Sequence, residues 1–133
     1  MKHKVTFTIA SLLSILLMTF HLTDDILRDQ GGVAQGGVSN LVVVLILIVW
    51  LYGTLVLAER RSGYVIILVG SLLGSFIAVA HMTGLAGDAV VGEIAKSSGA
   101  FFVWVVIGLG VTAIFSLILS ARGLWSLQRG QSK

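Results

Sequence analysis

Two histidines inside apolar stretches are the residues of this chain whose type and spacing could do chemistry. His21 and His81 stand 60 positions apart, and Asp24 and Asp25 follow the first of them by three and four residues, close to the same helical face. Two imidazoles with one or two carboxylates form a nitrogen and oxygen ligand set that suits zinc, copper(II), manganese or iron(II). The pattern therefore supports the hypothesis of a metal site built from His21, His81, Asp24 and Asp25.

The same histidines support other interpretations. Asp88 or Glu93, from a later loop, could complete the metal site. Two histidines on separate helices at one depth can also supply the axial ligands of haem b, and imidazoles that titrate near neutrality can handle protons or a substrate. The simplest interpretation is structural, because a histidine near a helix end often places its polar tip at an interface, with the acids marking the water boundary.

Four apolar runs must position these side chains, and they cover residues 5–27, 41–58, 64–82 and 100–121. A helix rises about 1.5 Å per residue, so about 20 apolar residues cross a hydrocarbon core roughly 30 Å thick. The chain is 56% hydrophobic and 11% charged, with a mean hydropathy of +1.02. These features predict an all-α integral membrane protein in which residues 1–133 form one domain, a bundle of four transmembrane helices.

The charges between the runs predict the orientation of the chain. Seven of the nine basic residues lie at the two ends of the chain or in the short loop 59–63: Lys2, Lys4, Arg60, Arg61, Arg122, Arg129 and Lys133. Basic residues beside membrane spans stay in the cytoplasm. We therefore expect both termini inside, outer loops at 28–40 and 83–99, and a cytoplasmic tail at 122–133. This multi-pass pattern fits a bacterial cytoplasmic membrane.

A weak internal repeat relates the first and third runs. An offset of 60 aligns residues 11–13 with 71–73 (Ser-Leu-Leu in both) and residues 21–23 (His-Leu-Thr) with 81–83 (His-Met-Thr). The match favours two repeated helical hairpins that run in the same direction, as in some transporters. It also favours keeping the first run as a span, although a basic start and an apolar stretch are typical of a cleaved signal peptide as well.

Small residues occupy the same helical face as each histidine. Seven and eleven positions before His81 lie Gly74 and Gly70, and the corresponding positions before His21 are Ser14 and Ala10. Small residues at this spacing let membrane helices approach closely. We therefore expect both histidines to face the interior of the bundle near its outer end. A further small and polar stripe in the last run predicts another packing face: Gly108, Thr112, Ser116 and Ser120.

Aromatic residues fall into two groups. Phe101, Phe102 and Trp104 start the last run, where an interfacial aromatic belt is expected, and Trp104 could also cover the histidines. Trp50 and Tyr52 lie deeper, in the second run, where they either fill the bundle or mark an interface with another subunit.

The rest of the sequence narrows the class of function. Cysteine is absent, which removes disulfide frameworks and thiolate zinc sites. No enzyme motif is present, and no basic cluster with interleaved aromatics indicates nucleic-acid binding. No acid lies inside a run, which weakens proton-driven transport. We expect a structural or accessory membrane subunit that acts by helix packing in the lipid bilayer, through self-association or in a larger membrane complex. The alternatives are a metal- or haem-binding bundle and a small transporter or facilitator.

Overall fold

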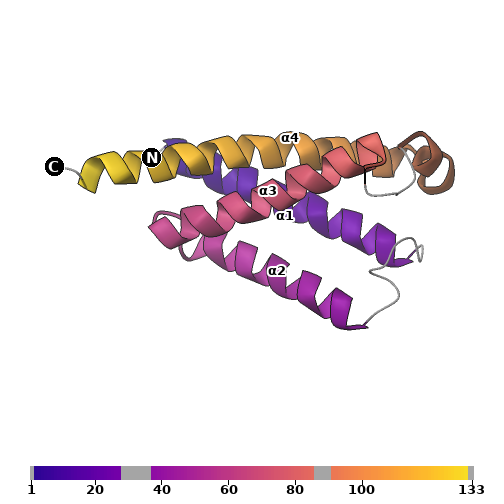
Figure 1. Cartoon of the computed structure of the whole chain (residues 1–133), viewed down its shortest axis with the longest axis horizontal. Coiled ribbons are helices and arrows are strands. Elements are labelled where there is room, and N and C mark those ends of the chain that lie inside the picture. The colour runs from indigo at the N-terminus through magenta and orange to yellow at the C-terminus, as the bar shows by residue number, and fades with distance from the viewer. Residues whose placement is uncertain (1, 28–36, 86–90, 132–133) are drawn as a thin grey trace.

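The described part of the chain is entirely helical. The computed structural model describes the backbone of residues 2–27, 37–85 and 91–131, and side chains over most of these ranges. Four helices follow in order (Figure 1): α1 (Lys2–Leu27), α2 (Gly37–Leu55), α3 (Arg61–Thr83) and α4 (Val91–Gln131). The predicted all-α class and the four helices are therefore confirmed.

Three of the helices have the length and composition to cross a membrane. The candidate spans are Lys4–Asp24 in α1, Arg61–Thr83 in α3 and Gly99–Gly130 in α4. In α2 the apolar stretch among the described side chains is Leu41–Leu55, which is shorter than these three spans. A multi-pass membrane protein is thus supported by three helices, while the fourth span, predicted at 41–58, and the N-in orientation remain predictions.

Local chemistry sets where the helices begin and end. The turn between α2 and α3 is closed by a hydrogen bond of 2.8 Å from Arg60 N–H to the Leu57 carbonyl. Arg60 itself has an extended backbone, after which α3 begins. At the other end, Gly84 adopts a left-handed conformation (φ 69°) and donates its N–H to the Ala80 carbonyl at 2.8 Å. Glycine takes this conformation without steric cost, which explains why α3 stops here.

The last helix is longer than the predicted span. It is helical from Val91, within the predicted outer loop, and is interrupted at Gly99, where φ is 78°. Beyond residue 121 it continues without a break to Gln131, so most of the predicted tail 122–133 is an extension of α4. The interruption falls just before the apolar run begins, and it separates the outer helical segment from the candidate span.

The helices form a bundle in which α2 is the least covered. In Figure 1, α4 lies along α3 and α1, and α2 lies against α3 and α1 on the side away from α4. Buried side chains from all four helices form the core: Phe7, Ile15, Met18, Trp50, Ile67 and Leu109. Trp50 is 2% exposed and fills the bundle, whereas Tyr52 is 52% exposed. The two deep aromatics of the second run thus have different environments.

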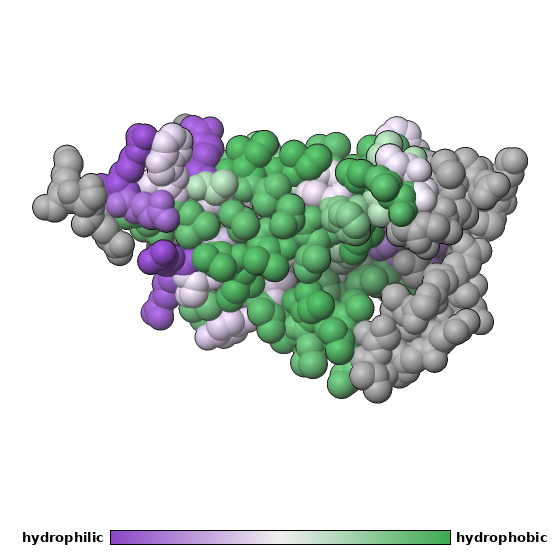
Figure 2. All heavy atoms as spheres, in the orientation of Figure 1, coloured by the Kyte–Doolittle hydropathy of each residue, from purple (hydrophilic) through white to green (hydrophobic). Residues whose placement is uncertain are grey.

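The surface is divided along the long axis of the bundle. Figure 2 shows hydrophobic side chains over its middle and hydrophilic ones at the end where α1 starts and α4 finishes. Lys4, Glu59, Arg60, Arg122 and Arg129 belong to this polar end. A broad apolar surface bounded by charge is what a bilayer requires of a spanning bundle.

Candidate functional site

The two predicted histidine ligands lie next to each other. The Nε2 atoms of His21 in α1 and His81 in α3 are 3.2 Å apart, and the ring centroids are 4.7 Å apart with the planes at 76°. His21 is 2% exposed and His81 is half-buried. The tautomers decide which ring donates and which accepts. The structure therefore joins α1 and α3 through a part-buried imidazole pair near the end opposite the charged surface.

Small side chains allow the helices that carry the histidines to come close to their neighbours. Ala10 and Ser14 of α1 are buried, as are Gly70 and Gly74 of α3. A Cβ atom at Gly74 would lie 3.3 Å from the Cβ of Ala113, so α3 and α4 pack tightly there. The side chains that contact Gly70 and Gly74 belong to this same chain. These glycines therefore allow close packing of helices within the bundle.

Phe102 is the aromatic residue that covers the histidines. Its ring is 3% exposed and its centroid lies 5.3 Å from that of His21 and 6.1 Å from that of His81. Trp104, which the sequence offered as a cover, is 70% exposed. From the sequence, Phe102 was expected only in the aromatic belt. Its four-residue spacing from Val106 is a sequence signal that the two side chains share one face of α4, and the structure shows that both are buried.

The predicted acidic ligands are not assembled into a complete site. Asp24 is half-buried and interacts electrostatically with His21. The side chains of Asp25 and Glu93, and the whole of Asp88, lie outside the described residues. Among the side chains that are described, no group of three or more histidine, aspartate or glutamate residues could hold a metal ion. The described site is therefore a histidine pair with one neighbouring carboxylate.

The distance between the two nitrogens indicates whether the histidine pair could bind a metal ion, form a direct hydrogen bond or hold a haem. A tetrahedral metal with bonds of about 2.0–2.1 Å to nitrogen places two such ligands about 3.3–3.4 Å apart, close to the observed 3.2 Å. A direct N–H···N hydrogen bond has nearly the same length. A haem held by both histidines would have to lie between the two rings. Two rings in contact under Phe102 leave no space for it, so haem b does not fit.

A second polar cluster joins α1 to α2. The indole Nε1 of Trp50 donates to Ser11 Oγ at 3.1 Å, and Ser11 Oγ lies 2.7 Å from Thr54 Oγ1. Thr54 Oγ1 also donates to the Trp50 carbonyl at 2.9 Å. All three side chains are buried. Water cannot replace these hydrogen bonds in the buried interior. The network therefore fixes how α2 packs against α1.

Four buried serines lie on the faces of α3 and α4 that enter the bundle. Ser75 Oγ donates to the Ser71 carbonyl and Ser120 Oγ to the Ser116 carbonyl, both at 2.8 Å. Such bonds give each buried hydroxyl a hydrogen-bond acceptor within its own helix. The hydroxyls of Ser71 and Ser116 find no hydrogen-bond partner in the described part of the chain, although both residues are fully buried. Ser116 and Ser120 belong to the polar stripe singled out from the sequence.

No protein-family model, curated protein or solved structure matches this chain. The chemistry available to it is therefore read from its own side chains. The histidine pair can share a proton along its 3.2 Å contact or offer two nitrogens to a metal. Of the buried hydroxyl groups described above, those of Ser11 and Thr54 join two helices.

Proposed function

We propose that this chain is a small accessory membrane protein that acts by helix packing, and that α2 is the helix through which it associates with a second copy. The observation that carries the proposal is the exposure of α2. Of the fifteen residues 41–55, the bundle buries three, Trp50, Gly53 and Thr54, and leaves ten exposed. The helix is apolar on all sides and contains no charged residue. A helix that is apolar all round is a core helix or a membrane span, and in a membrane a second helix can replace the lipid around it.

A groove beside α2 offers the surface for such packing. It encloses about 510 Å³ between α2 and α3. Its lining is apolar throughout: Val42, Leu45, Ile46, Val49, Trp50, Val65, Ile66, Val69, Gly70 and Leu73. The α2 residues recur at three- and four-residue spacing, which aligns the groove with the helix axis. A helix of a second copy, lying along this groove, would pack through van der Waals contact, which drives association within lipid.

Cysteine cross-linking in native membranes tests the proposal. The chain has no cysteine, so each single-cysteine variant reports one position. Val49→Cys places a thiol in the groove, and Ile118→Cys places one on α4; the native side chains are 52% and 49% exposed. We expect oxidation to give a disulfide-linked dimer with Val49→Cys and little with Ile118→Cys. Equal cross-linking of the two variants, or none from Val49→Cys, would contradict association through α2.

A second candidate function follows from the histidine pair. We propose that His21 and His81 bind a divalent transition metal such as zinc, because their nitrogen spacing of 3.2 Å is close to that of two ligands on one tetrahedral ion. Asp24 adds negative charge beside His21, and water fills the remaining positions.

Metal analysis of the purified protein tests this second candidate. The wild type should retain about one zinc per chain, and a His21→Ala/His81→Ala double variant should lose it. His3→Ala is the control, because it removes the third histidine of the chain and leaves the pair intact. The same metal content in the wild type and the double variant would refute metal binding by the pair. The transporter alternative gains no specific support from the described residues.

A further inference from the structure

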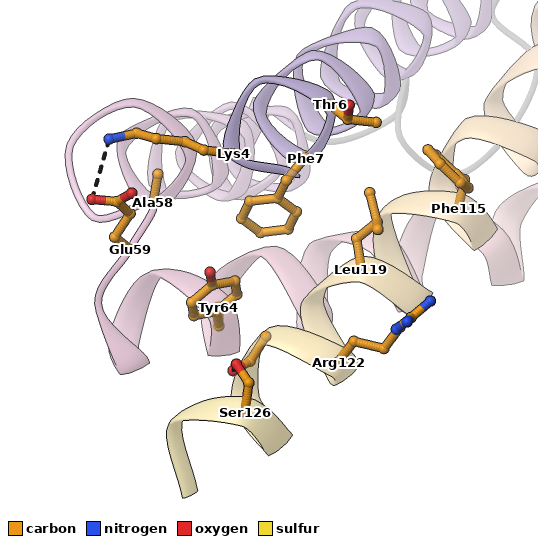
Figure 3. A pocket seen from close by; sticks show the side chains of 11 residues that line it. Lys4, Thr6, Phe7, Ala58, Glu59, Tyr64, Phe115, Leu119, Arg122 and Ser126 are labelled. Atoms are coloured by element: carbon orange, nitrogen blue, oxygen red, sulfur yellow. Dashed lines mark hydrogen bonds and ion pairs between the residues drawn. The ribbon is translucent and has the colours of Figure 1, made fainter. Parts of the chain in front are cut away.

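A pocket with one charged side and one apolar side lies at the polar end of the bundle. It encloses about 720 Å³ between the start of α1, the turn from α2 to α3, and the last part of α4. In Figure 3 the rings of Phe7 and Tyr64 lie near its centre, with Lys4 and Glu59 on one side and Arg122 and Ser126 on the other. The pocket does not involve the histidine pair or the groove beside α2.

The charged side of the pocket carries a net positive charge. Lys4 Nζ lies 3.2 Å from Glu59 Oε2, so this pair is neutral as a unit. Arg122 also lines the pocket, and no acidic side chain in the described ranges lies within ion-pair distance of it. A guanidinium presents several donors that match the oxygens of a phosphate. The Tyr64 side chain lines the same space, whereas the Ser126 hydroxyl already donates to the Gly123 carbonyl at 2.8 Å.

The apolar side of the pocket leads toward the middle of the bundle. Leu119 and Phe115 precede Arg122 by three and seven residues on α4, so the apolar wall extends about 10 Å from the guanidinium toward the hydrophobic band. Phe115 is 46% exposed, which places this end of the wall at the lateral surface of the bundle. Phe7 of α1 faces the wall and packs on Tyr64 with ring centroids 5.1 Å apart.

We propose that this pocket binds an anionic membrane phospholipid, with the phosphate at Arg122 and an acyl chain along Leu119 and Phe115. Three features of the pocket select this ligand class. The positive charge selects an anion, the guanidinium suits phosphate, and the apolar wall that reaches the lateral surface suits an acyl tail. A free phosphate would use only the first two. The expected depth of the pocket in the membrane also fits a phospholipid. Arg122 directly follows the last apolar run, where lipid headgroups meet the hydrocarbon core.

The lipid preference of the purified full-length protein tests the assignment. Native mass spectrometry in detergent would compare phosphatidylglycerol with phosphatidylcholine for the wild type, Arg122→Gln, Arg122→Lys and Arg129→Gln. Arg129 is the matched control, because it lies on the same helix, is exposed, and stacks on Trp125 at 4.0 Å without lining the pocket. Circular dichroism establishes that each variant retains its helices.

The expected result is a preference for phosphatidylglycerol that depends on Arg122. One charge-assisted contact to phosphate corresponds to about tenfold in affinity, so Arg122→Gln should weaken phosphatidylglycerol binding about tenfold. Arg122→Lys should retain part of the affinity, and Arg129→Gln should bind as the wild type does. Equal losses in Arg122→Gln and Arg129→Gln would overturn the site. Displacement of the lipid by millimolar inorganic phosphate would overturn the role of the apolar wall and assign the pocket to the free anion.

Discussion

Replacing Gly70 with alanine should destabilise the bundle far more than the same change at Gly74. A Cβ atom at Gly70 would lie 2.7 and 2.8 Å from two carbons of the Trp50 indole, closer than real contacts allow. The indole is 2% exposed and cannot move outward without breaking its hydrogen bond to Ser11. At Gly74 the nearest atoms would lie 3.3–3.5 Å away, which the neighbours accommodate with small shifts.

The cost at Gly70 has two parts. Overpacking a well-packed site costs about 1–3 kcal/mol, and loss of the Trp50–Ser11 hydrogen bond costs about 0.5–1.5 kcal/mol more. We therefore expect Gly70→Ala to lower the free energy of unfolding by about 2–4 kcal/mol, and Gly74→Ala by less than about 1 kcal/mol. Gly130→Ala, where no atom lies within 4 Å of the added Cβ, controls for the substitution itself.

Unfolding by sodium dodecyl sulfate in mixed micelles, followed by circular dichroism, measures these differences. Tryptophan fluorescence adds a second signal, because Trp50 is one of three tryptophans and its displacement from Ser11 changes its share of the emission. A Gly70→Ala variant within about 0.5 kcal/mol of Gly74→Ala would refute the packing of Trp50 on Gly70.

Three further changes test other contacts in the same unfolding assay. Ser11→Ala should cost about 1–2 kcal/mol because it removes both hydrogen bonds between α1 and α2, whereas Ser14→Ala, whose hydroxyl bonds only within its own helix, should cost less than about 0.5 kcal/mol; equal costs would contradict the network. Ser71→Ala should be neutral or stabilise by up to about 1 kcal/mol, since the buried hydroxyl has no partner in the described part of the chain, and a clear loss would reveal one. Lys4→Met should change stability by less than about 0.5 kcal/mol because Lys4 and Glu59 are 55% and 66% exposed, and a larger loss would show that the ion pair is structural.

The sequence predicted those features that follow from helix geometry alone. Apolar runs of span length define the helices, and an offset of 60 residues places His21 and His81 at one level on similar faces. The fixed rise and period of a helix therefore sufficed to predict that the two rings belong to the same end of the bundle. The 3.2 Å contact adds that α1 and α3 bring them side by side.

Features that depend on which helices pair were beyond the sequence. Trp50 had two interpretations, and the choice between them required knowing that it meets Gly70 of α3. Phe102 was assigned to the aromatic belt because its inward face becomes evident only when α4 is placed against the histidines. The pocket around Arg122 was not predicted, since its walls come from segments at both ends of the chain and in its middle.

Fluorescence energy transfer between labelled copies in liposomes tests association through α2 most directly. In the wild type, transfer should exceed that of randomly placed proteins and fall as lipid is added, as a dimer in equilibrium requires. A Leu45→Ala/Val49→Ala variant should lose most of this transfer, because both side chains line the groove. An Ile114→Ala/Ile118→Ala variant, altered at similarly exposed positions of α4, should keep it. Transfer at the random level in the wild type, or an equal loss in both variants, would contradict the proposed role of α2.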